Sequence, residues 1–310
     1  MYLIERLPYC KDVFLKPAYR ISPFQTSDIA INYGLRDDGN GKRFLQNHLR
    51  DASYVFTLSG RQALELSLSE FQLKKSDIVT ILTSSNNYYI SGCVTKTIEK
   101  FCSWSRKIET NTRVILINHE FGIPYPDLDG ISKIGIPVIE DRAHCFLSQN
   151  PQDNVGFVGD YVIYSLPKIF PVQLGGILQS NFNAPLPQDQ NDDLADYLLG
   201  VICHQAKRID QIVDLRRRNH RILERLFSAK GVVARWSLEE KIVPGVCMLK
   251  LPGWVNKERL KKHYQEYGVE SSIFYGEDAF FIPVHQRLQE VDLFYFLGLY
   301  ELFLEVSNDI

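Results

Sequence analysis

The sequence predicts an α/β protein with a large domain built on a mixed, mostly parallel sheet and a smaller C-terminal α+β subdomain. Short β-rich runs alternate with helical segments from about residue 54 to residue 180, which favours an open, largely parallel sheet. Runs such as Val114-Ile115-Leu116-Ile117 are apolar without alternation, as expected of strands that helices cover on both faces. Beyond this region the pattern changes to a long helix followed by separate strands and helices.

The elements of the large domain follow from local composition. The strands of its sheet are expected at residues 54–58, 78–83, 113–118, 136–140, 161–166 and 176–179. Residues 60–73 are expected to form a helix, because apolar and small residues recur there at 3–4 spacing. This stripe consists of Ala63, Leu64, Ser67, Leu68 and Phe71.

The second part of the chain is expected to begin after residue 200, so that residues 1–200 form the large domain and residues 201–310 the long helix and small domain. Residues 181–193 are rich in Pro, Asn, Gln and Asp, which indicates a mobile connection. The long helix is expected from about residue 205 to residue 229, and Gly231 is a plausible stop. A strand at 245–251 and helices at 256–267 and 292–304 are expected to follow.

Composition excludes several classes of protein. The chain has 310 residues, is 45% hydrophobic and carries a net charge of −2, so electrostatics favour neither nucleic acid nor an anionic membrane as a partner. No uncharged apolar run approaches the roughly 20 residues that span a bilayer. The six cysteines are scattered without metal-ligand spacing, so we expect buried or semi-buried reduced thiols, no metal site and a cytoplasmic protein.

Two short segments carry the chemistry of the chain. The acidic run Glu140-Asp141-Arg142-Ala143-His144 ends one expected strand, and Ser165-Leu166-Pro167-Lys168 ends the next. The carboxyl ends of parallel strands meet at the edge of the sheet where ligands of open α/β sheets bind. We therefore expect Asp141, Ser165 and Lys168 to lie close together.

An amine, a carboxylate and a hydroxyl are the groups that pyridoxal phosphate needs. The amine forms an imine with the aldehyde, and a carboxylate holds the pyridine nitrogen protonated. The phosphate binds best at a helix N-terminus. Ser59 and Gly60 lie between a strand and a helix, so the N–H groups of Gly60, Arg61 and Gln62 are expected to form an anion site.

Together these segments resemble the DegT/DnrJ/EryC1/StrS sugar aminotransferases, pyridoxal phosphate enzymes with the aspartate aminotransferase fold. The resemblance extends from about residue 40 to residue 305. It is carried by residues 59–64, similar to S-G-T-x-A-L; 118–124, similar to V-H-L-Y-G-x-P; 137–144, similar to P-V-I-E-D-A-A-H/Q; 159–176, in the order G-D…S-F…K…G-G; and 282–288, similar to L-P-x-H-x-x-L.

The resemblance implies a role for each candidate site residue. Lys168 would hold the cofactor covalently and move the proton between cofactor and substrate carbons, and Asp141 would pair with the pyridine nitrogen. His144 would lie beside the ring or its hydroxyl, and either Tyr88 or Tyr89 would stack on the ring. The contacts to the phosphate end would come from Ser59, Gly60, Arg61 and Ser165.

The resemblance also implies a reaction and partners. The expected activity is transfer of an amino group from an amino acid, glutamate in most of the family, to a keto-sugar attached to a nucleotide. The family's habit further implies a homodimer, because sites in this fold usually lie at a subunit interface.

Departures from the family pattern keep two alternatives open. Two residues separate Ser165 from Lys168 where the family has four, although the wider fold also uses S-x-x-K. Arg61 replaces a threonine, and residues 181–210 contain no match to the family's G-Y-N-x-R-M stretch. The alternatives are a degenerate binding or scaffolding protein with the same fold, and another pyridoxal phosphate reaction such as that of a lyase or dehydratase.

Single residues of the motifs also have structural interpretations. Lys168 on its own reads as a surface lysine after a strand, and His144 as a structural histidine. His119 and His285 are expected to be structural. Gly175-Gly176 indicates either a close approach of two backbones or a simple hairpin.

Overall fold

The computed structural model describes residues 18–187 and 191–308. They divide into two compact units. The large unit consists of Phe24–Ile209 and Glu240–Val243, and the small unit of the described residues up to Pro23, Asp210–Glu239 and the chain from Pro244 onward.

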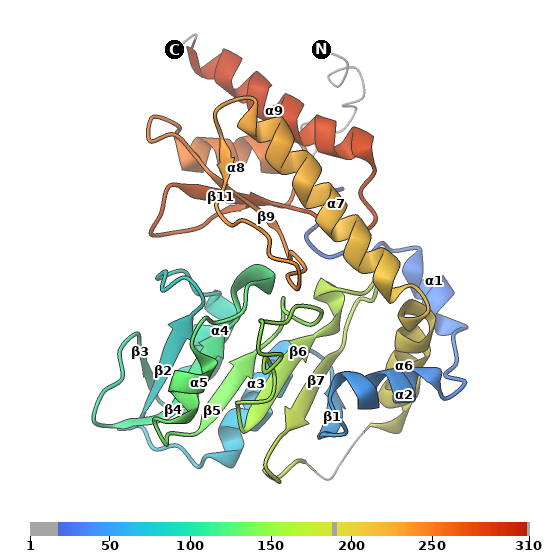
Figure 1. Ribbon diagram of the computed structural model, residues 1–310, viewed down its shortest axis with the longest axis vertical. Helices are drawn as coiled ribbons and strands as arrows, with labels where there is room; N and C mark the ends of the chain where they lie inside the picture. The colour runs from blue at the N-terminus through green and yellow to red at the C-terminus, as the bar shows by residue number, and fades with distance from the viewer. Residues whose placement is uncertain (1–17, 188–190, 309–310) are drawn as a thin grey trace. The chain divides into compact units, whose positions relative to one another are not determined.

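A seven-stranded sheet forms the centre of the large unit, with the strand order β1-β7-β6-β5-β4-β2-β3 (Figure 1). Strand β7 runs antiparallel to its neighbours β1 and β6, and the other neighbouring pairs are parallel. The expectation of a mixed, mostly parallel sheet is therefore confirmed. The strands are β1 (Ser53–Thr57), β2 (Ile78–Thr83), β3 (Ser103–Ser105), β4 (Thr112–Asn118), β5 (Val138–Asp141), β6 (Tyr161–Ser165) and β7 (Gly176–Ser180).

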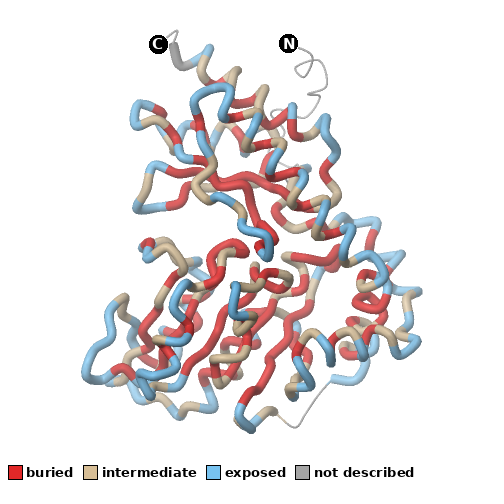
Figure 2. The backbone as a smooth tube through the Cα atoms, viewed as in Figure 1, coloured by how far each residue is buried: buried red, intermediate tan, exposed pale blue. Residues whose placement is uncertain are grey.

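Helices bury both faces of this sheet. Val114 and Leu116 of β4 belong to the core shared with α3 and α4, whereas Ile115 and Ile117 belong to the core shared with α5. Because both faces are covered, β4 is apolar at successive positions, and Figure 2 shows the central strands buried along most of their length. The helical segments are α1 (Asp28–Tyr33), α2 (Asn40–His48), α3 (Gly60–Glu70), α4 (Gly92–Ile98), η2 (Glu120–Gly122), α5 (Leu128–Ser132), η3 (Leu166–Lys168) and α6 (Asp192–Ala206).

The small unit has a core of its own. It contains a four-stranded antiparallel sheet with the order β10-β11-β9-β8. Aromatic and aliphatic residues of α7, α8 and α9 pack with β9 and β11 in one cluster. Its elements are α7 (Ile209–Ser228), β8 (Val233–Ala234), β9 (Cys247–Lys250), α8 (Lys257–Glu266), β10 (Ser272–Ile273), β11 (Ala279–Ile282) and α9 (Glu290–Asn308).

Helix α6 differs from the sequence expectation. The described part of the expected connection at 181–193 already enters this helix at Asp192, and α6 and α7 replace a single helix at 205–229. The side chain of Asn191 accepts a hydrogen bond from Leu194 N, and Asp192 and Asp193 lie in the first turn. An N-cap followed by acidic residues is a helix start signal, but the polar composition of this segment concealed it.

The division into units also differs from the expected boundary at residue 200, which falls inside α6. The large unit contains the whole of α6 and extends to Ile209, the first residue of α7. The described chain before Pro23 belongs to the small unit. Its residue Tyr19 forms a parallel bridge with Val269, and the Tyr19 hydroxyl donates a 3.1 Å hydrogen bond to Asp292 Oδ1. Within the described residues, no helix is both long and apolar enough to cross a bilayer.

Gly176 marks a close approach of two backbones in the large unit. It lies in register with Thr57 of β1 on one side and Ser165 of β6 on the other. A Cβ atom at Gly176 would lie 2.5 Å from the carbonyl carbon of Ser59 and 2.7 Å from Gly60 N. The close-approach interpretation of Gly175-Gly176 therefore holds at Gly176, where β7 packs against the start of α3.

Gly176→Ala should destabilise the large unit by about 1–3 kcal/mol, because the added methyl group meets rigid backbone and must displace the start of α3. The free energy of unfolding in urea measures this loss. Gly92→Ala is the matched control, since a Cβ atom there meets no described atom within 4 Å. A loss in Gly176→Ala no larger than that of the control would contradict the close approach.

Candidate active site

Three strands bring polar side chains to one edge of the large sheet, and a fourth begins there with a glycine. Asn118, Asp141 and Ser165 are the last residues of β4, β5 and β6, and Asn118 is paired in register with Asp141. Because β7 is antiparallel, its first residue, Gly176, reaches the same edge beside Ser165. The expected meeting of strand ends is therefore present in the structure.

A cavity of about 440 Å³ opens at this edge, within the large unit. Its size falls in the range of roughly 300–1,000 Å³ that is typical of small-molecule sites. The residues that the sequence singled out meet here although they are far apart along the chain. Those that line the cavity are Ser59, Gly60, Arg61, Asp141, His144, Ser165 and Lys168.

Tyr88 does not line this cavity, and the expectation that either Tyr88 or Tyr89 stacks on a cofactor ring stays a prediction. Its side chain is 75% exposed, and its ring lies 5.9 Å from the Arg106 guanidinium. Arg106 also donates to the carbonyl oxygen of Asn87, so this arginine holds the segment that carries Tyr88. Tyr89 does not line the cavity either; its ring centroid lies 6.0 Å from that of Phe121.

Asp141 is a buried carboxylate with defined donors. Its side chain is 5% exposed, Ala143 N donates to Oδ1 at 2.9 Å, and Asn118 Nδ2 donates to Oδ2 at 3.0 Å. Burial raises the pKa of Asp141, while the two hydrogen bonds and the charge of Lys168 act in the opposite direction. The donors therefore favour the ionised form that a protonated ring nitrogen requires.

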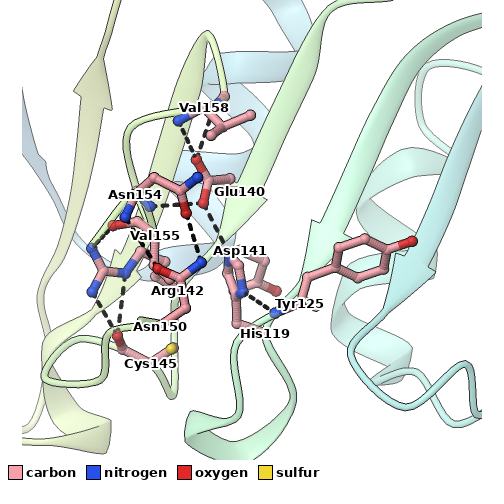
Figure 3. A network of polar contacts seen from close by, with 12 residues as sticks. His119, Tyr125, Glu140, Asp141, Arg142, Cys145, Asn150, Asn154, Val155 and Val158 are labelled. Atoms are coloured by element: carbon pink, nitrogen blue, oxygen red, sulfur yellow. Dashed lines mark hydrogen bonds and ion pairs between the residues drawn. The ribbon is translucent and has the colours of Figure 1, made fainter. Parts of the chain in front are cut away.

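The neighbouring carboxylate, Glu140, serves the protein interior instead (Figure 3). Successive residues of a strand point to opposite faces, so Glu140 and Asp141 enter different surroundings. The Glu140 carboxylate is fully buried and accepts hydrogen bonds from His119 Nε2 and from the N–H groups of Gly156, Val158 and Gly159. Burial alone would raise the pKa of Glu140, but the hydrogen bond from His119 and those from these N–H groups lower it.

The proton on His119 can be assigned from its partners. Tyr125 N donates to His119 Nδ1 at 3.0 Å, so Nδ1 is an acceptor (Figure 3). The ring proton therefore resides on Nε2, which donates to Glu140 at 3.0 Å. This contact joins a neutral imidazole to a carboxylate rather than two full charges, and the expectation that His119 is structural agrees with it.

Arg142 fixes the turn that carries Ala143 and His144. It stands where the family motif has alanine, and its fully buried guanidinium donates to the carbonyl oxygens of Cys145, Phe146, Ser148 and Val155. Several backbone acceptors thus satisfy one buried cation. The turn is held in place behind the cavity, with the His144 ring centroid 5.1 Å from that of Phe121.

The start of α3 forms the other end of the cavity. Ser59 is its N-cap and accepts a 3.2 Å hydrogen bond from Gln62 N, while Gln62 Oε1 accepts from Leu58 N. Gln62 N–H is thus engaged in the cap, which reduces the expected three-amide anion site to Gly60 and Arg61. A Cβ atom at Gly60 would lie 3.2 Å from Ser165 Cβ, so the helix start and the end of β6 are close neighbours.

Cys93 lines the same cavity and was not expected there. It is exposed, which corrects the expectation of buried or semi-buried thiols throughout, and Arg61 Nη2 lies 2.7 Å from its Sγ atom. Partial burial would raise the pKa of Cys93, but hydrogen bonds with Arg61 and Ser91 and the charges of Arg61 and Lys168 lower it.

Sequence reasoning missed Cys93 and Asn118 for different reasons. Asn118 ends a strand next to the one that ends at Asp141, so the strand-end rule that found Asp141 could have found it too. Cys93 lies in α4, which is not part of any recognised motif, and no signal in the sequence places it near Arg61.

Comparisons with known proteins identify the fold. No protein-family model matches the sequence, and no curated protein matches it. Solved structures do match. A putative sugar aminotransferase from Streptococcus pneumoniae is 14% identical with a TM-score of 0.71, covering 95% of this chain and 100% of its own.

Two further structures agree. The aminotransferase TlmJ from Streptoalloteichus hindustanus is 16% identical with a TM-score of 0.70, and the match covers 91% of this chain and 95% of that one. The GDP-4-keto-6-deoxy-D-mannose-3-dehydratase of E. coli is 12% identical with a TM-score of 0.66, covering 92% and 100%. The chain has the fold of these enzymes. The expected aspartate aminotransferase-like fold is thereby confirmed.

Glu140→Gln should lower the free energy of unfolding by about 3 kcal/mol near neutral pH. The buried carboxylate accepts hydrogen bonds from four donors, and glutamine replaces one of its oxygens with an NH2 group that cannot accept them. The pKa of Glu140 is lowered in the folded state, so its stabilising effect is present above the ordinary value of 4.5 and is lost as the pH falls below it. Urea unfolding near neutral pH and in acid measures both effects. Glu109→Gln, at an exposed position, is the control. If the difference in unfolding free energy between Glu140→Gln and wild type does not shrink in acid, Glu140 is not the ionised group of this network.

Cys93 should be the first of the described cysteines to react with iodoacetamide at neutral pH, because it is exposed and its pKa is lowered. Arg61→Gln should slow its alkylation about threefold to tenfold by reducing the thiolate fraction. Peptide-resolved mass spectrometry measures each site and separates Cys93 from Cys10, which lies outside the described residues. Equal rates in Arg61→Gln and in the exposed control Arg113→Gln would refute the contact.

Proposed function

We propose that this chain is a pyridoxal phosphate-dependent aminotransferase that transfers an amino group from an amino acid, glutamate as in most sugar aminotransferases, to a keto-sugar attached to a nucleotide. The observation that carries the proposal is the meeting of Lys168, Asp141 and the N-terminus of α3 in one cavity. Each of these groups has a different task toward the same cofactor, and chain elements distant in sequence supply them.

The residues of the cavity fit this cofactor. The donor set contains an amine, a buried carboxylate whose donors favour ionisation, and a helix start beside a hydroxyl. Gly60 and Gly176 allow the helix start to lie against the strand ends, since a side chain at Gly176 would occupy the position of the α3 backbone. When bound, pyridoxal phosphate supplies a ring that accepts electrons from a substrate carbon.

Lys168 would supply the amine that holds the cofactor. Its Nζ atom, once released by an incoming amino group, is a base that can take a proton from one carbon and return it to another. The carboxylate of Asp141 would accept the hydrogen bond of the ring nitrogen. Asp141 is oriented for that role by Ala143 N and Asn118 Nδ2.

The opposite end of the cavity would hold the phosphate. The N–H groups at the start of α3 carry the positive end of the helix dipole. The Arg61 guanidinium adds a full positive charge, and the Ser165 hydroxyl lies beside Gly60. His144, on the turn fixed by Arg142, would border the ring or its hydroxyl.

The solved neighbours support a transaminase. The Streptococcus pneumoniae protein is described in a PLP form and in a PMP form. An aminotransferase alternates between these two forms, so a fold that accommodates both suits the proposed reaction. The E. coli dehydratase, described with bound hydrated PLP, makes another pyridoxal phosphate reaction on a sugar the second candidate.

The sequence alone made the short spacing between Ser165 and Lys168 an argument for a degenerate protein. The structure weakens that argument. The 3₁₀ turn η3 follows β6 directly, and both residues line the same cavity. The amine therefore stays at the site although two residues, instead of four, separate it from the serine. The proposal includes a homodimer in the cytoplasm, in keeping with the family that the sequence resembles.

Addition of pyridoxal phosphate to the purified protein should produce a visible absorption band that borohydride removes, with the cofactor mass then found on the Lys168 peptide. Lys168→Ala should lose the band and at least about a thousandfold of the amino transfer to nucleotide-linked keto-sugars, because no other amine of the site replaces it. The exposed Lys133→Ala should behave as wild type.

Three outcomes would speak against the proposal. A colourless wild-type protein would favour the degenerate protein, and a band that survives in Lys168→Ala would mean that a different lysine holds the cofactor. Loss of water from the sugar without amino transfer would favour the dehydratase.

A further inference from the structure

Asn118 departs from the family motif at the site. The V-H-L-Y-G-x-P pattern has valine at the position of Asn118, and valine cannot donate a hydrogen bond. In this chain Asn118 is half-buried, lines the cavity, and is paired in register with Asp141 on the neighbouring parallel strand. The replacement therefore adds a polar group directly beside the carboxylate.

The contact made by this group is specific. Asn118 Nδ2 lies 3.0 Å from Asp141 Oδ2, while Ala143 N lies 2.9 Å from Oδ1. Each carboxylate oxygen thus has one defined donor, one from the adjacent strand and one from the following turn. Two donors on different oxygens restrict rotation of the carboxylate about its χ2 bond and leave further lone pairs for a ligand.

Burial of Asp141 increases the effect of this hydrogen bond on the ionisation of its carboxyl group. Asp141 is 5% exposed, so burial disfavours its ionised form and each donor opposes that effect. The other groups that favour its ionised form are the backbone N–H of Ala143 and the charge of Lys168. His119 also lines the cavity, with its ring neutral. Of the two hydrogen-bond donors to the carboxylate in the described part of the chain, Ala143 donates through its backbone and Asn118 through a side chain that substitution can remove.

We propose that Asn118 is a positioning residue, which orients the Asp141 carboxylate and keeps it ionised toward the cofactor ring. The part that concerns the ring rests on the proposed function. The part that concerns Asp141 does not, since the hydrogen bond exists within the protein itself.

The experiment compares Asn118→Val with Asn118→Thr. Valine restores the family pattern and removes the hydrogen-bond donor. Threonine has nearly the same shape as valine but carries a hydroxyl group that can donate. Asn111→Val is the matched control, because Asn111 is an exposed asparagine that precedes β4 and donates to Ser76 O. Circular dichroism and urea unfolding establish that each variant is folded.

The first readout is the titration of the Asp141 carboxyl group in cofactor-free protein, followed by its carbon-13 shift and assigned by the signal lost in Asp141→Asn. The midpoint should rise by about one pH unit in Asn118→Val, remain nearer to wild type in Asn118→Thr and be unchanged in Asn111→Val. A merely structural asparagine would leave this midpoint where it is.

The second readout is affinity for pyridoxal phosphate. Asn118→Val should bind about tenfold more weakly than wild type, and Asn118→Thr should recover most of that loss. An unchanged Asp141 midpoint in Asn118→Val overturns the inference whether or not the cofactor binds. A raised midpoint in a protein that binds no pyridoxal phosphate overturns the proposed function and supports the role of Asn118 toward Asp141.

Discussion

The buried carboxylate of Glu140 is the interaction on which the site depends. It collects the imidazole of His119 and three N–H groups of the segment from Gly156 to Gly159, and so ties the ends of β4 and β5 to the chain that leads into β6. The strand alternation that sends Glu140 into this network sends Asp141 into the cavity. The Glu140 carboxylate is fully engaged in hydrogen bonds within the protein, whereas the Asp141 carboxylate faces the cavity and can contact a ligand.

Much of the fold and part of the site could be predicted, because they follow from local rules. Unalternated apolar runs gave the central strands, and the rule that parallel strand ends converge brought Asp141, Ser165 and Lys168 together. Cys93 and the exposure of Tyr88 could not be predicted, since they depend on how Arg61 and Arg106 direct their long side chains in three dimensions. Helix α6 was missed because polar residues conceal a helix start in a composition typical of loops.

The departures from the family pattern each have a contact within the chain. Arg142, in place of alanine, meets four backbone carbonyl oxygens behind the site. Arg61, in place of threonine, hydrogen-bonds to the thiol of Cys93, and Asn118, in place of valine, donates a hydrogen bond to the carboxylate of Asp141. Each of these polar side chains has a hydrogen-bond partner, as buried and half-buried polar groups in folded proteins generally do. The three substitutions therefore form a set of hydrogen bonds around one cavity.

The distribution of charge in this cavity favours a ligand with an anionic end. The described lining residues include two basic side chains, Arg61 and Lys168, against one carboxylate, Asp141, while the tautomer of His119 makes that ring neutral. The cavity therefore carries a positive excess although the chain as a whole has a net charge of −2. The start of α3 adds the positive end of a helix dipole on the side of Arg61. A molecule with a phosphate at one end and a protonated ring nitrogen at the other would match both ends of this field, whereas a neutral ligand would leave the cations uncompensated.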